Sequence, residues 1–267
     1  MKDNIKRVFF GVEVEAPWPT ELPRGRVLDA AHRHMTLAFL GNISYPPLRD
    51  ILPNFPTPPM RIGLVGHFDK CLALPPHHPH VIAWHAYWQD DSRDLISFQK
   101  ALSNWLRENN YTVDEREWLP HATLCRQPFN PREWEKAFSP IPFYTGAINL
   151  YESMGNLSYV PLWSYPLLVP FEEIEHMADM AFKVYGETIQ QLYHHAFTAL
   201  AFKFPQLLNY FKPIDSIQTL DEIIMALNDI IGRADAEIGC PMKAVSFHGD
   251  IMTHANATLE WEMIVDV

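Results

Sequence analysis

The stretch RHMTLAFLG at residues 33–41 contains HMTL at positions 34–37, and LPHATLCR at residues 119–126 contains HATL at positions 121–124. The chain therefore carries the pattern His-x-Thr-Leu twice. In a β-strand, side chains two positions apart lie on the same face, so each copy presents an imidazole and a hydroxyl together and turns its apolar side chains the other way. The sequence predicts two strands that each offer one histidine and one threonine.

Two imidazoles and two hydroxyls suit the cleavage of a phosphodiester. Displacement at phosphorus needs one group that takes a proton from the attacking water and another that gives a proton to the leaving oxygen. Histidine titrates near neutral pH and can do either, while hydroxyls can hold the non-bridging oxygens, and no metal is required. The alternative is that the motifs are two half-buried histidines whose hydrogen bonds are satisfied by neighbouring threonines.

The first part of the chain resembles the 2H phosphoesterases, in particular the bacterial RNA 2',3'-cyclic phosphodiesterase branch that is also called 2'-5' RNA ligase. The resemblance extends over residues 5–168 and rests on RVFFGVEV, HMTLAFLG, GHFDK, PHATLCR and LYESMGNLSYVPLWSYPL, in that order. It implies an α+β fold with two similar α/β lobes that face each other across a groove. It also implies that His34 and His121 are the acid/base pair and that Thr36 and Thr123 hold the phosphate, without a cofactor.

Two further features bear on this part. Arg126 matches the arginine often seen after the second motif, which implies added positive charge for the phosphate or the RNA backbone; the alternative is a solvated surface arginine. The intervening segment DLISFQKALSNWLRENNY at residues 94–111 has apolar side chains at helical spacing and predicts a helix. Its expected core residues are Leu95, Phe98, Leu102, Trp105 and Leu106.

The two parts of the chain differ in net charge. The protein has 267 residues, 48% of them apolar, and a formal net charge of -11. Residues 1–168 carry 16 Lys and Arg against 17 Asp and Glu, whereas residues 169–267 carry 5 against 15. With SYPLLVPFEEIEH as a connector, we predict one domain at 1–168 and a second at 169–267. The first can approach a polyanion, and the acidic second suits a cation or a basic protein partner.

The location of the protein is predicted from what the sequence lacks. The N-terminal segment has no continuous apolar stretch of the kind that a signal peptide contains, and no segment approaches the roughly 20 apolar residues of a membrane span. The three cysteines lie far apart and form no Cys-x-x-Cys pair. We therefore expect a cytoplasmic protein that does not bind a membrane.

The second part has the pattern of a strand, a turn and a helix. Met180, Phe182 and Val184 alternate as a buried face, Gly186 ends the strand, and Thr188 with Gln191 predicts a capping box. The expected helix stripe consists of Ile189, Leu192, Ala196 and Leu200. A second strand, LEWEMIVDV at residues 259–267, buries Leu259, Trp261, Met263 and Val265.

This second part resembles archease, the small protein that activates the GTP-dependent tRNA-splicing ligase. The resemblance rests on HMADMAFKVYGETIQQLYHHA, on KAVSFH and on the terminal VDV. It implies a small α/β domain with a divalent metal, often calcium, at Asp179, Asp266 and Val267, and a role for Lys243 in ligase activation. Exposed aspartates on strands are otherwise simply solvated. The chain departs from the family at Met177, where the family has threonine, and by a much shorter stretch before MKAVSF.

The expected function is metal-independent hydrolysis of RNA 2',3'-cyclic phosphate ends to 2'-phosphates, fused to a module that activates an RNA-splicing ligase. Both halves would then belong to RNA repair or tRNA splicing. One alternative is a non-catalytic accessory protein of such a ligase, in which the first part only holds an RNA end. Another is a phosphodiesterase of small cyclic nucleotides, because the same chemistry would act on them.

Overall fold

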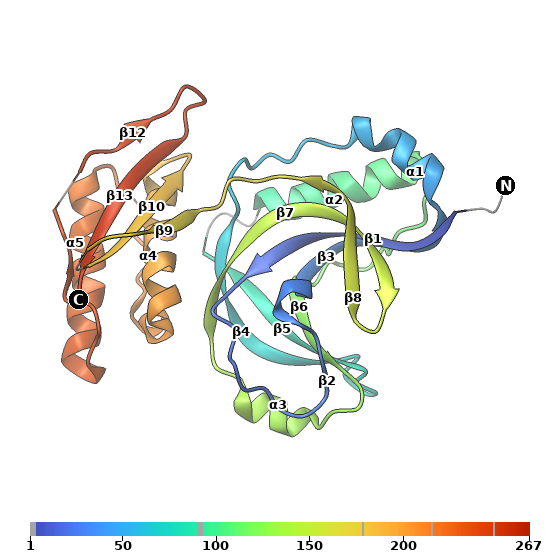
Figure 1. Cartoon of the computed structure of the whole chain (residues 1–267), viewed down its shortest axis with the longest axis horizontal. Coiled ribbons are helices and arrows are strands. Elements are labelled where there is room, and N and C mark those ends of the chain that lie inside the picture. The colour runs from blue at the N-terminus through green and yellow to red at the C-terminus, as the bar shows by residue number, and fades with distance from the viewer. Residues whose placement is uncertain (1–3, 90–92, 178, 215, 248) are drawn as a thin grey trace.

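The computed structural model describes residues 4–267 except 90–92, 178, 215 and 248, and it has a mixed α/β fold with two sheets (Figure 1). The first sheet and its helices consist of β1 (Ile5–Glu15), β2 (Arg26–Val27), η1 (Ala30–His32), β3 (His34–Ser44), α1 (Tyr45–Ile51), η2 (Leu52–Asn54), β4 (Val65–Leu74), β5 (Val81–Trp88), α2 (Arg93–Glu108), β6 (His121–Arg126), α3 (Pro131–Ala137), β7 (Ile141–Gly155) and β8 (Ser158–Tyr165). The second part consists of β9 (Phe171–Ile174), β10 (Met180–Gly186), α4 (Ile189–Lys203), η3 (Pro205–Tyr210), α5 (Leu220–Ile238), β11 (Ala244–Val245), β12 (Met252–Thr253) and β13 (Leu259–Asp266).

The strands of the first sheet close on themselves. Their order is β1-β3-β6-β5-β4-β7-β8, and β1 also pairs with β7, so six antiparallel strands form a ring. β8 extends β7, and the short β2 pairs with β6. The predicted division into two separate lobes is therefore not confirmed, because backbone hydrogen bonds join the strands of both motifs into one sheet.

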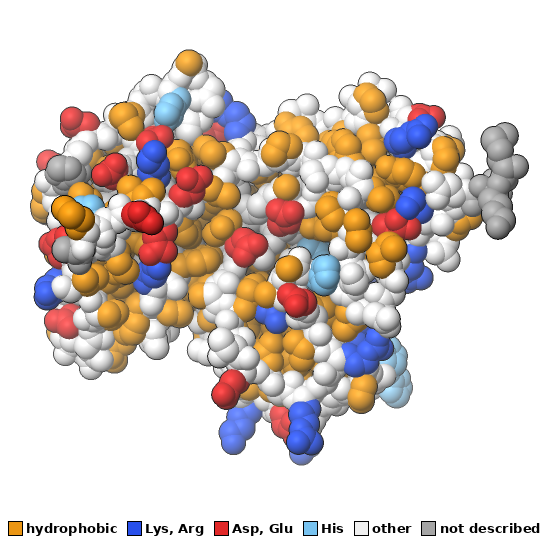
Figure 2. Space-filling view, viewed as in Figure 1, with side chains coloured by type: hydrophobic (Ala, Val, Ile, Leu, Met, Phe, Trp, Pro, Cys, Tyr) orange, Lys and Arg blue, Asp and Glu red, His pale blue; other side chains and the backbone are white. Residues whose placement is uncertain are grey.

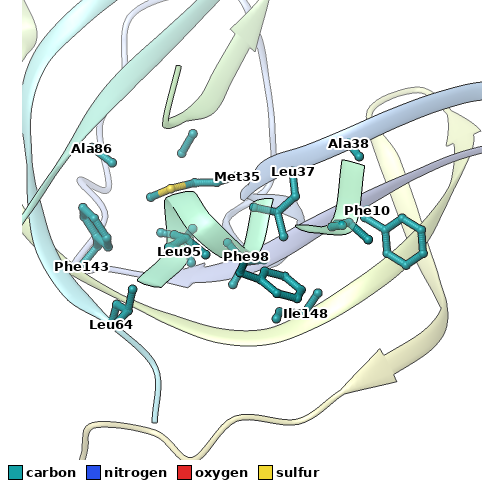
Figure 3. Close-up of a cluster of buried hydrophobic side chains, with 14 of the residues drawn as sticks. Phe10, Met35, Leu37, Ala38, Leu64, Ala86, Leu95, Phe98, Phe143 and Ile148 are labelled. Carbon is teal, nitrogen blue, oxygen red and sulfur yellow. The ribbon is translucent and has the colours of Figure 1, made fainter. Parts of the chain in front are cut away.

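Helix α2 contributes to the main core of this part. Leu95, Phe98, Leu102 and Leu106 are fully or almost fully buried, as the helical spacing predicts, and Trp105 is partly buried against the same core. Figure 3 shows Leu95 and Phe98 among side chains of β1, β3 and β7, including Phe10, Leu37 and Ile148. Each such side chain stabilises the fold by about 1.5–3 kcal/mol through burial.

The alternation of side chains on the strands separates an apolar face from a polar one. Val8, Phe10, Val12, Met35 and Leu37 are buried in the core. On the same strands Glu13, His34 and Thr36 have the opposite parity. Strands β5 and β6 repeat the pattern, with Ile82, Trp84, Ala122 and Leu124 in the core and His85, His121 and Thr123 on the other face. We call this second face the histidine face.

The second sheet has the order β11-β13-β10-β9, with β12 paired to β13. The predicted strands and helix are observed, and Phe182, Val184, Trp261, Met263 and Val265 are buried. Helix α4 is buried almost all round, because Leu192, Tyr193 and residues 195–201 are all buried. Of the helices in the described ranges, none is long and apolar enough to cross a membrane.

The predicted capping box at the start of α4 is only half correct. Thr188 Oγ1 accepts a hydrogen bond from the Gln191 amide at 3.1 Å, as expected. The Gln191 side chain, however, accepts from the amide of Glu187 rather than from that of Thr188, so the two bonds are not reciprocal. A complete capping box occurs instead at the start of α5, between Thr219 and Glu222.

Aromatic side chains join the two parts of the molecule. Tyr144 of β7 stacks on Phe202 of α4, with ring centroids 5.5 Å apart, and both rings contact Phe171 of β9. Thr198 of α4 donates to the Gln89 side chain at 3.1 Å. The nearly complete burial of α4 follows from these contacts on one side and from its own sheet on the other.

Candidate active site

The two His-x-Thr motifs lie side by side on adjacent antiparallel strands, and the histidine of each motif is opposite the threonine of the other. Met35 of β3 is paired with Ala122 of β6 in an antiparallel ladder. One step along this register places His34 opposite Thr123 and Thr36 opposite His121. In such a ladder, directly opposed Cβ atoms are about 4.5–5.5 Å apart and diagonal pairs about 7–8 Å. The two histidines form such a diagonal pair, so the four side chains lie on one face of two neighbouring strands.

Both imidazoles are anchored by the same kind of hydrogen bond. His34 Nδ1 lies 2.8 Å from the carbonyl oxygen of His32, and His121 Nδ1 lies 2.7 Å from that of Leu119. A carbonyl oxygen only accepts, so each Nδ1 carries the proton and each neutral ring has its lone pair on Nε2. This assignment makes Nε2 the nitrogen that can exchange a proton with a substrate.

His34 lies in an aromatic enclosure. Its ring stacks on Phe9 with centroids 4.7 Å apart, and Tyr159 of β8 meets it edge-on at 4.9 Å. Only 8% of His34 is exposed. This burial lowers the pKa of His34 to about 4, although the bond to His32 opposes the shift, and the nearby positive groups His121 and Arg126 lower the pKa further. His34 is therefore neutral near pH 7 and suited to act as a base.

Gly11 of β1 leaves room for the His34 ring. It is paired with Thr36, and a Cβ atom placed on it would lie 3.3 Å from His34 Cδ2 and 3.1 Å from the Met35 carbonyl oxygen. These distances are tighter than ordinary van der Waals contact. A larger residue at position 11 would push on the imidazole or on β3.

His121 is less enclosed than His34. It is partly exposed at the start of β6, directly after Pro120 as the sequence predicts. Burial lowers the pKa of His121, the hydrogen bond to Leu119 raises it, and the neighbouring His85 lowers it. The more exposed ring is the easier of the two to protonate when an anionic substrate is nearby.

Arg126 faces the same site. Leu124 forms a bulge between Thr123 and Cys125, and this extra residue leaves Arg126 opposite Val81, on the face that also carries His121. The guanidinium is close enough to His34 to lower the pKa of that ring. In the backbone ladder between β6 and β2, Arg126 is opposite Arg26. Figure 2 shows Lys and Arg side chains gathered at the lower edge of the molecule, over β2 and α3.

The backbone of the first motif has a tertiary support as well. Trp118 Nε1 donates to the carbonyl oxygen of Thr36 at 2.8 Å, and the Gln99 side chain of α2 donates to that of Leu37 at 3.1 Å. Thr36 and Thr123 are themselves partly exposed. The strand that carries Thr36 is thus held in place from two sides.

The sequence analysis did not predict His85 and Asp69 as site residues. His85 of β5 is paired with His121, and its Nδ1 lies 2.6 Å from the Asp69 carboxylate of β4. The only signal in the sequence was the alternation in VIAWHAYW, which puts His85 out of phase with the apolar Trp84 and Ala86. That pattern cannot say which other strand lies beside β5.

The predicted metal ligands lie near one end of the second sheet. Met180 pairs with Val265 at the end of the ladder, and Asp179 and Asp266 each lie one residue beyond this pair. Asp266 Oδ1 accepts from Ser246 at 3.1 Å, and the Lys243 ammonium donates to the main-chain oxygen of Val267 at 2.5 Å. Lys243 thus supplies a positive charge to Val267 without a metal. The described residues contain no group of three or more His, Cys, Asp or Glu side chains that could hold a metal ion, so this site stays a prediction.

The remaining histidines of the second part have structural contacts where they are described. His195 is buried and its Nδ1 lies 2.5 Å from the carbonyl oxygen of Tyr185. His254 Nε2 lies 2.9 Å from the Glu260 carboxylate, and His194 contacts Gln190. His248 lies outside the described residues.

No protein-family model matches the chain, and no curated protein matches it. Among solved structures, the chain is similar to E. coli LigT complexed with 3'-AMP, with 20% identity, a TM-score of 0.46, and coverage of 61% of this chain and 99% of that chain. It is similar to a phosphoesterase with 20% identity, a TM-score of 0.44, and coverage of 61% and 98%. It is also similar to the Thermus thermophilus protein TT0787 with 18% identity, a TM-score of 0.42, and coverage of 60% and 97%. At these TM-scores the case for a function depends on the side chains described above.

Proposed function

We propose that the protein hydrolyses 2',3'-cyclic phosphate ends of RNA to 2'-phosphates by a two-histidine acid/base mechanism. The observation that carries this proposal is the crossed pairing about Met35 and Ala122, which brings two imidazoles and two hydroxyls onto one face. A phosphate between the motifs would have a proton acceptor, a proton donor and two hydroxyl ligands around it. The positive charge of Arg126 on the same face supports an anionic substrate.

In the proposed reaction His34 is the base, because burial keeps its ring neutral. His34 Nε2 takes a proton from water as the water oxygen forms a bond to phosphorus. The bond from phosphorus to O3' breaks, and protonated His121 gives its Nε2 proton to that oxygen. Thr36 and Thr123 donate hydrogen bonds to the non-bridging oxygens while negative charge builds on them. One water is consumed, and the two rings return to their starting states by exchanging protons with solvent.

The second part is proposed to act as an activator of an RNA-splicing ligase, through Lys243 and the acidic end of the sheet at Asp179 and Asp266. The resemblance of its sequence to archease supports this role. A divalent cation such as calcium, when bound, would supply a positive charge between the two carboxylates. Such a ligase consumes RNA ends of the same cyclic kind, so both halves would act on one substrate.

The hydrolytic proposal is tested by incubating the full chain, in the presence of a chelator, with a short RNA that ends in a 2',3'-cyclic phosphate. We expect an RNA 2'-phosphate as the product and its loss when His34 and His121 are both replaced by Ala. A cyclic mononucleotide in parallel identifies the preferred substrate length. Absence of turnover, or turnover that persists in the double variant, would reject the proposal and leave the accessory role.

The activator proposal is tested separately with a GTP-dependent RNA-splicing ligase. The His34→Ala, His121→Ala double variant should stimulate ligation as well as the unmodified chain does, whereas Lys243→Ala should not. Lys212→Ala, an exposed lysine of the same part, is the matched control. If neither the unmodified chain nor the control stimulates ligation, the second part has another role.

A further inference from the structure

A third histidine stands beside the proposed acid/base pair. Strand β5 lies between β6 and β4, and His85 of β5 is paired with His121 of β6. Directly opposed side chains on one face of an antiparallel pair have Cβ atoms about 4.5–5.5 Å apart. His85 is therefore as close to His121 as any side chain of the neighbouring strand can be.

A local irregularity of β4 fixes the direction of the His85 ring. The ladder between β4 and β5 shifts register between Phe68 and Lys70, and Asp69 is the extra residue at that point. Bulges of this kind re-aim a side chain and are common next to active sites. Here the Asp69 carboxylate lies 2.6 Å from His85 Nδ1.

The contact with Asp69 determines which nitrogen of His85 is available. The two ring nitrogens point in different directions. Because Asp69 of β4 contacts Nδ1, Nε2 points away from β4 and toward the other neighbouring strand, β6, which carries His121. A carboxylate only accepts, so Nδ1 carries a proton. Nε2 can then donate as well only when a second proton makes the ring an imidazolium, whose charge would be paired with Asp69. The His85 side chain is still 18% exposed, which leaves an edge for a ligand.

We propose that His85, held in place by Asp69, is a further substrate-binding residue that donates a hydrogen bond from Nε2 to the phosphate beside His121. This inference rests on the proposed function. It extends the phosphate site from two strands to three and adds a hydrogen-bond donor on the side of His121 that Arg126 does not occupy. Since this bond forms with the bound substrate and persists during the reaction, its loss should weaken binding more than turnover.

The test uses the full chain with the substitutions His85→Gln and Asp69→Asn. His254→Gln is the matched control, because His254 forms the same kind of imidazole–carboxylate pair with Glu260 in the second part. For each variant we would measure kcat and KM on the cyclic-phosphate RNA and the inhibition constant of inorganic phosphate. A charge-assisted hydrogen bond is worth about a factor of ten in affinity.

The expected result for His85→Gln is a rise of roughly tenfold in both KM and the inhibition constant, with kcat changed by less than about threefold. Asp69→Asn should shift both constants in the same direction by a smaller factor, and the control should leave them unchanged. If the His85→Gln variant does not fold, the inference is tested instead by titrating inorganic phosphate into the unmodified chain with labelled histidines. One histidine resonance that shifts with phosphate should then lose its response in Asp69→Asn.

Unchanged KM and unchanged inhibition by phosphate in a folded His85→Gln variant would overturn the inference while leaving the proposed hydrolysis intact. A fall of kcat with KM unchanged would also overturn it. If the unmodified chain does not hydrolyse the RNA, the proposed function fails instead, and the phosphate titration still tests the contact with His85.

Discussion

His34 and His121 bind main-chain carbonyls in the same way, each from Nδ1 to the residue two positions earlier, at 2.8 Å for His32 and 2.7 Å for Leu119. The two rings thus present the same nitrogen to the same face of the sheet. Their surroundings differ, because His34 is enclosed by Phe9 and Tyr159 while His121 is partly exposed. Equal anchoring with unequal burial gives the two histidines different protonation behaviour.

The pH dependence of catalysis should reflect this difference. The base His34 must be neutral, so kcat/KM should fall as the pH drops through about 4, the lowered pKa of His34. The acid His121 must be protonated, and its pKa is lowered from 6.5 by burial, so the rate should also fall as the pH rises toward 6.5. A rate profile of the free enzyme should peak between these values. A profile that rises steadily from pH 6 to 9 would contradict the assignment.

His34 should also make the fold sensitive to acid. Its pKa is about 4 in the folded protein and 6.5 without burial, so the unfolded chain binds more protons between these values. The contribution of His34 to the free energy of unfolding is fully present above pH 6.5 and is lost as the pH falls toward 4. The loss is at most about 3 kcal/mol, at about 1.4 kcal/mol per pKa unit. Urea unfolding of His34→Gln should show a smaller loss between pH 7 and 4.5 than the unmodified chain. An equal loss in both would contradict the burial of His34.

Gly11→Ala should impair turnover more than stability. The added methyl would meet His34 Cδ2 at 3.3 Å and the Met35 carbonyl at 3.1 Å, so the ring must move by a few tenths of an ångström. Small displacements of a reacting group can cost up to about a hundredfold in rate, and we expect a loss of kcat of about tenfold. Gly232→Ala, where an added Cβ meets nothing, is the control for the measurement of kcat and melting temperature.

Arg126→Gln should weaken substrate binding. Its guanidinium faces the site, and its loss removes a charge-assisted contact to phosphate, with KM for the RNA expected to rise roughly tenfold. The dependence of binding on salt should weaken at the same time, because one cation no longer releases counterions. Arg132→Gln on α3, an exposed arginine, should change KM much less. Equal effects of both substitutions would indicate a general surface charge instead of a site.

Thr219→Ala should destabilise the second part without affecting hydrolysis. Thr219 and Glu222 form the reciprocal capping box of α5, and removal of an N-cap hydroxyl costs about 1 kcal/mol. A denaturant titration should show this loss, while kcat and KM on the cyclic phosphate stay the same. A change in KM would mean that α5 communicates with the histidine face.

Much of the local structure could be predicted because it depends on local periodicity. The alternation in HMTL and HATL indicated which side chains share a face, and the spacing of Leu95, Phe98 and Leu102 indicated the buried side of α2. The predicted box at Thr188 and Gln191 was half wrong because the Gln191 side chain accepts from the amide of Glu187, the residue before Thr188. Neighbouring donors of this kind cannot be separated by sequence spacing.

The sequence by itself determined that two strands would each turn a histidine and a threonine away from the core, because that follows from the two-residue repeat of any strand. Only the tertiary structure decided that β3 and β6 are neighbours in a closed ring, that Met35 meets Ala122, and that His85 with Asp69 lies beside His121. Strand order and register depend on hydrogen bonds and packing between segments that are far apart in the chain. Local sequence patterns therefore do not determine strand order or register.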